Sequence, residues 1–93
     1  MTKYLMINHG VGAPEHWEVY FDMLIGGDHL VGGSSLASGI SLKDGQYAGA
    51  ISDSVTGYIV IQVENLEQAK DFMIKSPIHR AGGTVELFPL EET

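Results

Sequence analysis

The sequence predicts an α+β protein with the βαββαβ element order of the ferredoxin-like fold, in which two helices cover one face of an antiparallel sheet. The clearest evidence is residues 58–63 (Tyr-Ile-Val-Ile-Gln-Val), which are almost continuously apolar and β-branched, as in a buried strand. A capped helical segment, the pair Gly82-Gly83 and a further strand at 84–88 follow. An earlier strand, a helix and a strand from the middle of the chain precede them, which completes the order.

The first strand covers residues 3–8 and ends in the flexible turn 9–12. Pro14 suits the first position of a helix, where its missing N–H costs nothing. Large apolar residues then recur at helical spacing and form one face; they are Trp17, Tyr20, Phe21 and Leu24. Gly26-Gly27 is a typical helix end.

The middle of the chain predicts shorter extended pieces. Residues 29–31 begin a strand that we expect to break at 32–35 (Gly-Gly-Ser-Ser). Residues 37–42 and 47–51 are the arms of a hairpin, because Asp44-Gly45 is a turn signal between them.

The second helix has both of its ends marked. Asn65 can cap its first turn, with Gln68 three residues later as the capping-box partner. Its predicted buried face consists of Leu66, Ala69, Phe72 and Met73. Pro77 ends it.

Composition limits the possible partners. The 93 residues fit one domain, residues 1–93, with a formal charge of −7. An acidic surface repels phosphate backbones and anionic lipids, so we expect no nucleic acid and no membrane as partner. There is no cysteine, no apolar run long enough to span a bilayer and no signal-peptide pattern. A cytoplasmic location follows as the expectation.

The second face of the sheet predicts a homodimer. If both helices cover one face, strand alternation leaves apolar side chains on the other; we expect these to be Tyr4, Met6, Val60 and Phe88. Such a patch is too apolar for a monomer, so a second copy packing sheet against sheet is the expected remedy.

The topology sorts the candidate site residues. It places His9, His16, His79 and Asp44 at one end of the sheet, and His29 at the other. His16 borders the apolar helix face, and a neutral imidazole there suits proton transfer when a carboxylate orients it. We expect the ligand pocket around it to include His9, Tyr20, His79 and Tyr47. No paired histidine spacing and no glycine-rich phosphate motif occurs, so we expect neither metal nor cofactor.

Two segments resemble the YCII-related family, including its DGPF-type branch. Residues 57–69 (GYIVIQVENLEQA) are similar to the family's passage into the second helix, and residues 76–90 (SPIHRAGGTVELFPL) to its ending. Trp17 and Gly32-Gly33 fall where the family has a helix aromatic and a small-residue turn. The resemblance covers most of the chain.

The resemblance implies a ferredoxin-like dimeric α+β barrel with a pocket between the sheet and its loops. Residues 44–48 (Asp-Gly-Gln-Tyr-Ala) are the nearest counterpart of the DGPFA hallmark, with Gln and Tyr replacing its Pro and Phe. His16 matches the histidine of the proposed catalytic pair in the YCII branch. Ser76 stands at the usual acidic position, so Asp28 and Asp44 are the candidate carboxylate partners.

Two functions from different classes stay open. One is a small enzyme with a His-based acid–base site acting on a small molecule. The alternative is a non-catalytic dimeric module that binds a small ligand or a partner protein. A cofactor-free oxygenase rests on fold analogy alone.

Overall fold

The structure, a computed structural model, describes residues 1–91. Its elements, in chain order, are β1 (Thr2–His9), α1 (Pro14–Gly26), β2 (Leu30–Ser35), β3 (Ile40–Lys43), β4 (Gln46–Gly49), β5 (Val55–Val63), α2 (Leu66–Lys75), α3 (Pro77–Arg80) and β6 (Thr84–Pro89). Among the helices that the structure describes, none is both long and apolar enough to span a membrane.

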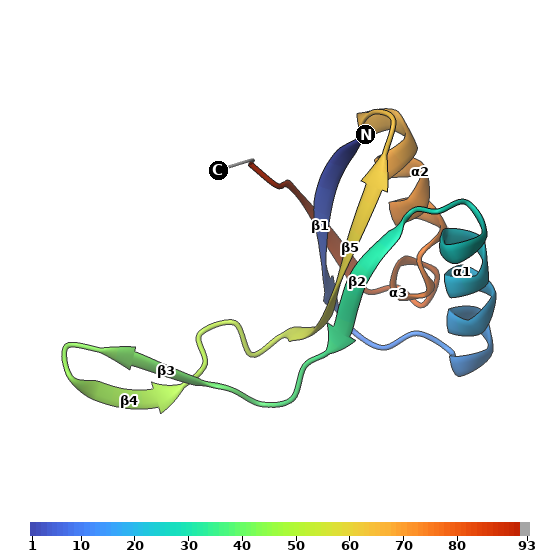
Figure 1. Ribbon diagram of the computed structural model, residues 1–93. Helices are drawn as coiled ribbons and strands as arrows, with labels where there is room; N and C mark the ends of the chain where they lie inside the picture. The colour runs from blue at the N-terminus through green and yellow to red at the C-terminus, as the bar shows by residue number, and fades with distance from the viewer. Residues whose placement is uncertain (92–93) are drawn as a thin grey trace.

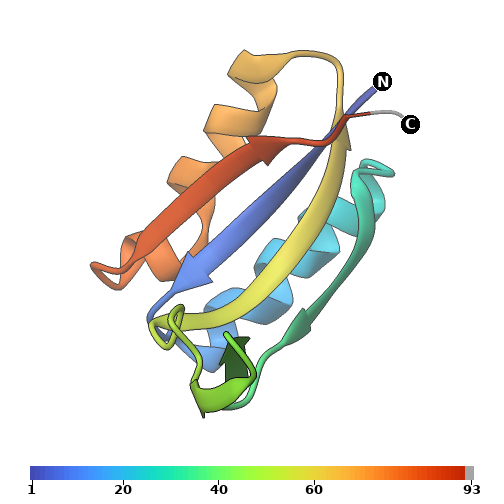
Figure 2. The ribbon, with the colours of Figure 1, turned by 90° about the vertical axis from the view of Figure 1, so that its left-hand side faces the viewer.

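Four strands form one antiparallel sheet in the order β2-β5-β1-β6. All three helices lie on the same side of it, and the opposite side is uncovered (Figure 1). Viewed from that uncovered side, the four strands lie in front of the helices (Figure 2). This arrangement confirms the predicted α+β ferredoxin-like fold.

The helix boundaries follow the predicted local chemistry. The Asn65 side chain accepts a hydrogen bond from the Gln68 backbone N–H at 2.9 Å, and the Gln68 side chain accepts one from the Glu64 N–H at 2.8 Å. The first bond satisfies an N–H group that the first turn of α2 leaves unpaired, and the second ties the residue before the N-cap to the same turn. Pro14 and Pro77 occupy the first turns of α1 and α3, where a missing N–H costs nothing.

The core lies between the sheet and the helices. β5 alternates strictly, with Ile59, Ile61 and Val63 buried against the helices. Two expected positions are wrong: Tyr4 and Met6 are 8% and 0% exposed and belong to this core, not to the other face. The register explains this, because Tyr4 lies opposite Ile61 and Met6 opposite Ile59, and paired residues share a face.

The opposite side of the sheet, called the open face below, is half-exposed and apolar along its centre. Its apolar residues are Leu5, Ile7, Tyr58, Val60 and Phe88. Val60 and Phe88 are therefore where we expected them. No element among residues 1–91 covers this face (Figure 1).

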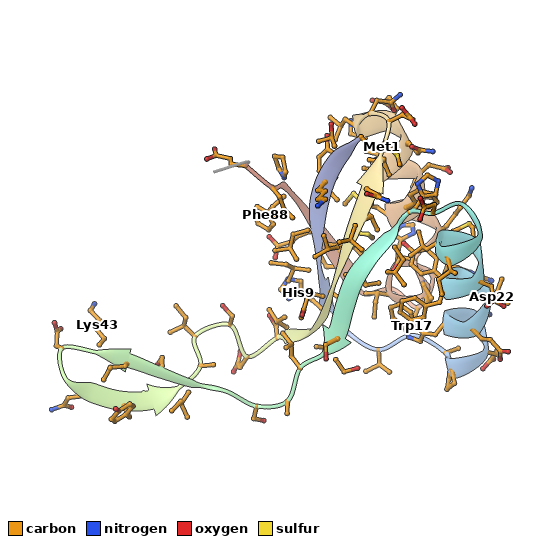
Figure 3. All side chains as sticks on the ribbon, viewed as in Figure 1. Met1, His9, Trp17, Asp22, Lys43 and Phe88 are labelled. Atoms are coloured by element: carbon orange, nitrogen blue, oxygen red, sulfur yellow. The ribbon has the colours of Figure 1, made fainter. Side chains whose placement is uncertain are left out.

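The strands β3 and β4 form a separate two-stranded hairpin, called the arm below, which projects away from the sheet (Figures 1 and 3). The predicted hairpin is thus present. The expected break at Gly32-Gly33 is wrong, because β2 continues through both glycines to Ser35. Glycine weakens a strand through entropy but does not prevent ladder pairing with β5.

Candidate functional site

A cavity of about 520 Å³ lies between α1 and the end of the sheet where β1 stops and β5 starts. Its size lies in the range of small-molecule sites. The lining comes from both layers and from the loop after β1: Asn8, Gly10, Val11, Gly12, Trp17, Phe21, Leu30, Gly32, Gly33, Ser34, Ser35, Thr56, Gly57, Tyr58, Ile59 and Ile78. Glycines on β2 and β5 keep the sheet side of the cavity free of large side chains.

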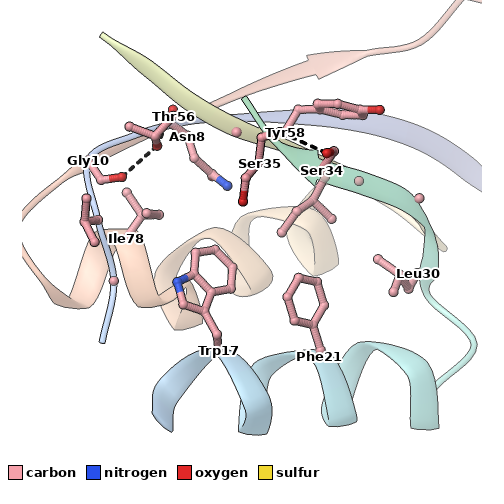
Figure 4. A pocket seen from close by; sticks show the side chains of 16 residues that line it. Asn8, Gly10, Trp17, Phe21, Leu30, Ser34, Ser35, Thr56, Tyr58 and Ile78 are labelled. Atoms are coloured by element: carbon pink, nitrogen blue, oxygen red, sulfur yellow. Dashed lines mark hydrogen bonds between the residues drawn. The ribbon is translucent and has the colours of Figure 1, made fainter. Parts of the chain in front are cut away.

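Two aromatic rings of α1 form the floor of the cavity. Trp17 and Phe21, one helical turn apart, rise from α1 toward the sheet (Figure 4). Their ring centroids lie 5.5 Å apart and their planes differ by 24°, so the rings form one nearly continuous surface. A surface of this kind stacks well against another flat ring.

The sheet supplies polar groups opposite this aromatic floor. The Asn8 side chain points from β1 into the cavity, and the Ser35 hydroxyl points in from the end of β2 (Figure 4). Asn8 is only 4% exposed, and its Oδ1 has no hydrogen-bond partner in the described chain. A buried amide oxygen without a hydrogen-bond partner lowers the stability of the fold by about 1–3 kcal/mol. A residue kept at this cost indicates a role other than stability.

A β-bulge fixes the position of Asn8. The register of β1 with β5 shifts between Asn8 and His9, which leaves Thr56 as the extra residue. The Thr56 hydroxyl lies 2.6 Å from the Gly10 carbonyl oxygen and 3.2 Å from that of Asn8, so it can donate to either (Figure 4). Bulges commonly re-aim side chains next to sites. Here the bulge anchors the turn that forms the cavity wall.

The cavity lining carries no formal charge. It contains no Asp, Glu, His, Lys or Arg, and the ring of Tyr58 points away from the cavity, onto the open face (Figure 4). An ionised ligand would therefore lose its hydration without gaining a counter-ion. The arrangement suits a neutral, flat molecule that presents a hydrogen-bonding group to Asn8.

His16 lies outside this cavity. It lines a shallower groove of about 440 Å³ with Val19, Tyr20, Met23, Ile74, Lys75 and Arg80. The two candidate carboxylates are not brought to it. Asp28 follows the far end of α1, and Asp44 lies in the turn of the arm, away from the sheet (Figure 1). Within residues 1–91, no hydrogen bond joins His16 to either of them.

Of the four expected pocket residues, Tyr20 lines the groove with His16, and the other three do not line it. Tyr20 is buried behind Trp17, its hydroxyl donates to the Phe72 carbonyl at 2.7 Å, and burial raises its pKa. His79 on α3 lies 3.0 Å from the Ile74 carbonyl oxygen. Tyr47 is on the arm, 73% exposed. His9 lies on the open face and contacts Ser54 and Glu86.

The sequence did not point to Asn8 or Ser35. Alternation puts Asn8 on the same face as Met6, but the sequence analysis expected that face to be the one away from the helices. Within residues 1–91, no group of three or more His, Cys, Asp or Glu side chains is placed to hold a metal ion.

The fold and the cavity together define a small α+β protein with an uncharged, aromatic-floored cavity beneath a ferredoxin-like sheet. No family model matches the chain, and no curated protein matches it. A solved structure that is similar in fold is the 5-chloro-2-hydroxyhydroquinone dehydrochlorinase of Burkholderia phenoliruptrix AC1100, in complex with 2,5-dihydroxybenzoquinone. The two chains are 14% identical, 90% of each is covered, and the TM-score is 0.53.

Proposed function

We propose that this protein binds a small, neutral, hydroxylated ring compound in the cavity between α1 and the sheet. The observation that carries the proposal is the pairing of a flat aromatic floor, Trp17 and Phe21, with the Asn8 side-chain amide opposite it, whose nitrogen points into the cavity (Figure 4). A ring stacked on the floor could direct one hydroxyl to Asn8 and a second to Ser35. Each such hydrogen bond contributes about 0.5–1.5 kcal/mol.

The solved neighbour supports a hydroxylated ring as the ligand, while the absence of charge on the ligand is inferred from the cavity of this chain alone. Its structure holds 2,5-dihydroxybenzoquinone, a small ring with hydroxyl groups. At 14% identity the likeness extends to the fold and not to individual residues. The ligand class therefore rests on the cavity of this chain, and the neighbour is an independent reason to test ring compounds first.

This proposal favours the binding module over the acid–base enzyme. The cavity lining has no imidazole and no carboxylate, so the cavity of a single copy offers its ligand no side chain suited to act as a general base. The acid–base role of His16, with Asp28 or Asp44, stays a prediction. Membership of the YCII-related family and a cytoplasmic location also stay predictions.

A homodimer through the open face is part of the proposal. Leu5, Ile7, Tyr58, Val60 and Phe88 form an apolar strip on this face, and a second copy of the same sheet would cover it. Native mass spectrometry at low micromolar concentration tests this part separately. A dimer is expected, and a monomer would contradict it.

Calorimetric titration tests the proposed ligand class. Hydroquinone, which is neutral, is expected to bind, and 2,5-dihydroxybenzoate is expected to bind much more weakly because no cation lines the cavity. Trp17→Ala should weaken hydroquinone binding about tenfold, since an aromatic stack contributes roughly 1 kcal/mol beyond its buried area.

The matched control is Val19→Ala on the same helix. Val19 is 68% exposed and does not line the cavity, so its loss should leave binding unchanged. Equal binding of the two ring compounds, or equal effects of the two variants, would contradict the proposal.

A further inference from the structure

Three side chains on the open face form a hydrogen-bonded relay. The His9 Nδ1 lies 2.9 Å from the Ser54 Oγ, and the His9 Nε2 lies 2.5 Å from the Glu86 Oε1. Ser54 is 45 residues and Glu86 77 residues from His9 in the chain, so only the folded sheet brings them together. This relay, Ser54–His9–Glu86, lies outside the cavity and is independent of the proposed ligand binding.

We propose that the relay is a nucleophile–base–acid site that accepts an acyl group from neutral esters onto Ser54. The Glu86 carboxylate can only accept a hydrogen bond when ionised, so it selects the tautomer with hydrogen on His9 Nε2. The His9 Nδ1 then carries a free lone pair facing the Ser54 hydroxyl. A serine hydroxyl that faces one nitrogen of an imidazole, with a carboxylate on the other nitrogen, is the constellation that activates a serine on unrelated folds; here the roles of the two ring nitrogens are exchanged.

The backbone holds His9 in this role. Strand alternation turns the consecutive residues Asn8 and His9 to opposite sides of the sheet, Asn8 into the cavity and His9 onto the open face, and the β-bulge of β5 lies opposite them. The side chains of His9 and Glu86 are 22% and 47% exposed. In a single copy a substrate can therefore reach the relay without any rearrangement of the sheet. The homodimer proposed above uses the same face, so the relay requires that a second copy leave this end of the sheet uncovered.

The surroundings determine the substrate class. Ile7 lies two residues before His9 on the same face, and its cross-strand neighbours are Tyr58 and Glu86. An apolar surface therefore begins next to the relay and continues along the open face. The Glu86 carboxylate and the net charge of −7 disfavour anions. A neutral ester with an apolar acyl group fits these surroundings.

The chemistry needs only the ester and water. The Ser54 oxygen bonds to the ester carbonyl carbon while its proton passes to His9 Nδ1. The bond from that carbon to the alcohol oxygen then breaks, and the alcohol leaves with the proton. Water attacks the acyl-serine by the same route, which releases the acid and returns the proton to Ser54.

Labelling with a fluorophosphonate tests the proposal directly on the purified full-length protein. The Ser54 oxygen displaces fluoride from phosphorus, and peptide mapping by mass spectrometry locates the adduct. We expect the adduct at Ser54, and a labelling rate on the order of 100-fold lower in His9→Gln, the usual share of a general base. Glu86→Gln should cause a smaller loss.

Ser52 is the internal control, because it lies in the same exposed turn and makes no side-chain hydrogen bond to His9 among the described residues. Labelling of Ser52 and Ser54 at equal rates, labelling unaffected by His9→Gln, or no labelling at all would overturn the proposal. Circular dichroism checks that each variant folds. If His9→Gln does not fold, Ser54→Ala in its surface turn must abolish hydrolysis of p-nitrophenyl butyrate, and retained hydrolysis would overturn the proposal equally.

Discussion

The two faces of the sheet differ in what they can do. The helix-covered face holds a tightly packed core and an uncharged cavity, and its polar contribution to that cavity comes from Asn8 and neighbouring hydroxyl groups. The open face holds an apolar strip that ends at His9 and Glu86, where ionisable side chains meet. In a single copy the sheet therefore separates ligand binding from proton transfer. Strand alternation positions both, because Asn8 and His9 are consecutive.

The largest expected effect is the difference in stability lost when a residue on each face of the sheet is replaced by alanine. Ile61→Ala should lower the free energy of unfolding by about 2–5 kcal/mol, because Ile61 is fully buried and its loss leaves a cavity. Its neighbour on the other face is the matched control: Val60→Ala should cost about 1 kcal/mol or less. Urea denaturation measures both. Equal losses at low protein concentration would mean that the open face is as well covered as the core.

The pH dependence of stability tests how completely the helix-covered face excludes water. Burial raises the pKa of the Tyr20 phenol above its ordinary value of about 10, so the native state keeps this proton where the unfolded chain loses it. The contribution of Tyr20 to the free energy of unfolding is fully present below pH ~10. It falls by about 1.4 kcal/mol for each further pH unit.

Tyr20→Phe should remove this decline and cost about 1 kcal/mol at neutral pH, because the hydrogen bond to the Phe72 carbonyl is lost. Denaturation curves between pH 9 and pH 11, a range chosen to bracket the ordinary phenol value of about 10, compare the two proteins. An identical alkaline decline in both would show that Tyr20 is not its source.

Asn8→Leu should raise the stability of the fold and weaken ligand binding. The amide oxygen is buried without a partner, so an apolar side chain of similar volume should raise the free energy of unfolding by about 1 kcal/mol. The same change should weaken hydroquinone binding, since the cavity loses its central polar group. Thermal denaturation and calorimetry measure the two effects. A variant that is less stable, or that binds unchanged, would refute the role assigned to Asn8.

The smallest expected effect concerns the arm. Replacing residues 37–50 by a short flexible linker should change monomer stability by less than about 0.5 kcal/mol, because β3 and β4 pair with each other and not with the sheet. A loss of several kcal/mol would show that the arm packs on the body. A fall in dimer content would show that it serves the interface between copies.

Local pattern was enough to predict most of the fold. Asn65 with Gln68, Pro14, and the helical spacing of Trp17 through Leu24 each act over a few residues, and each is found as expected. The faces of β1 were not predictable this way. Residues 4–7 are apolar at both parities, so alternation alone did not decide which side faces the helices.

The sites depend on contacts that sequence spacing does not encode. His9 meets Glu86 across 77 residues, and the unpartnered state of Asn8 is a property of its three-dimensional surroundings. Asp44 was expected beside His16 because the hairpin was assumed to lie against the sheet. Because the arm projects away from the sheet, Asp44 does not lie near His16. No local signal predicts whether a hairpin packs on its own domain.

The most direct test of the central claim is an NMR titration of the cavity with hydroquinone. Trp17 is the single tryptophan, so the spectrum contains one indole N–H resonance, and it reports on the cavity floor. Binding in the cavity should cause saturable shifts of this resonance and of the Asn8 side-chain amide, with the Tyr47 backbone amide on the arm unaffected. An unchanged indole resonance at saturating hydroquinone would contradict it.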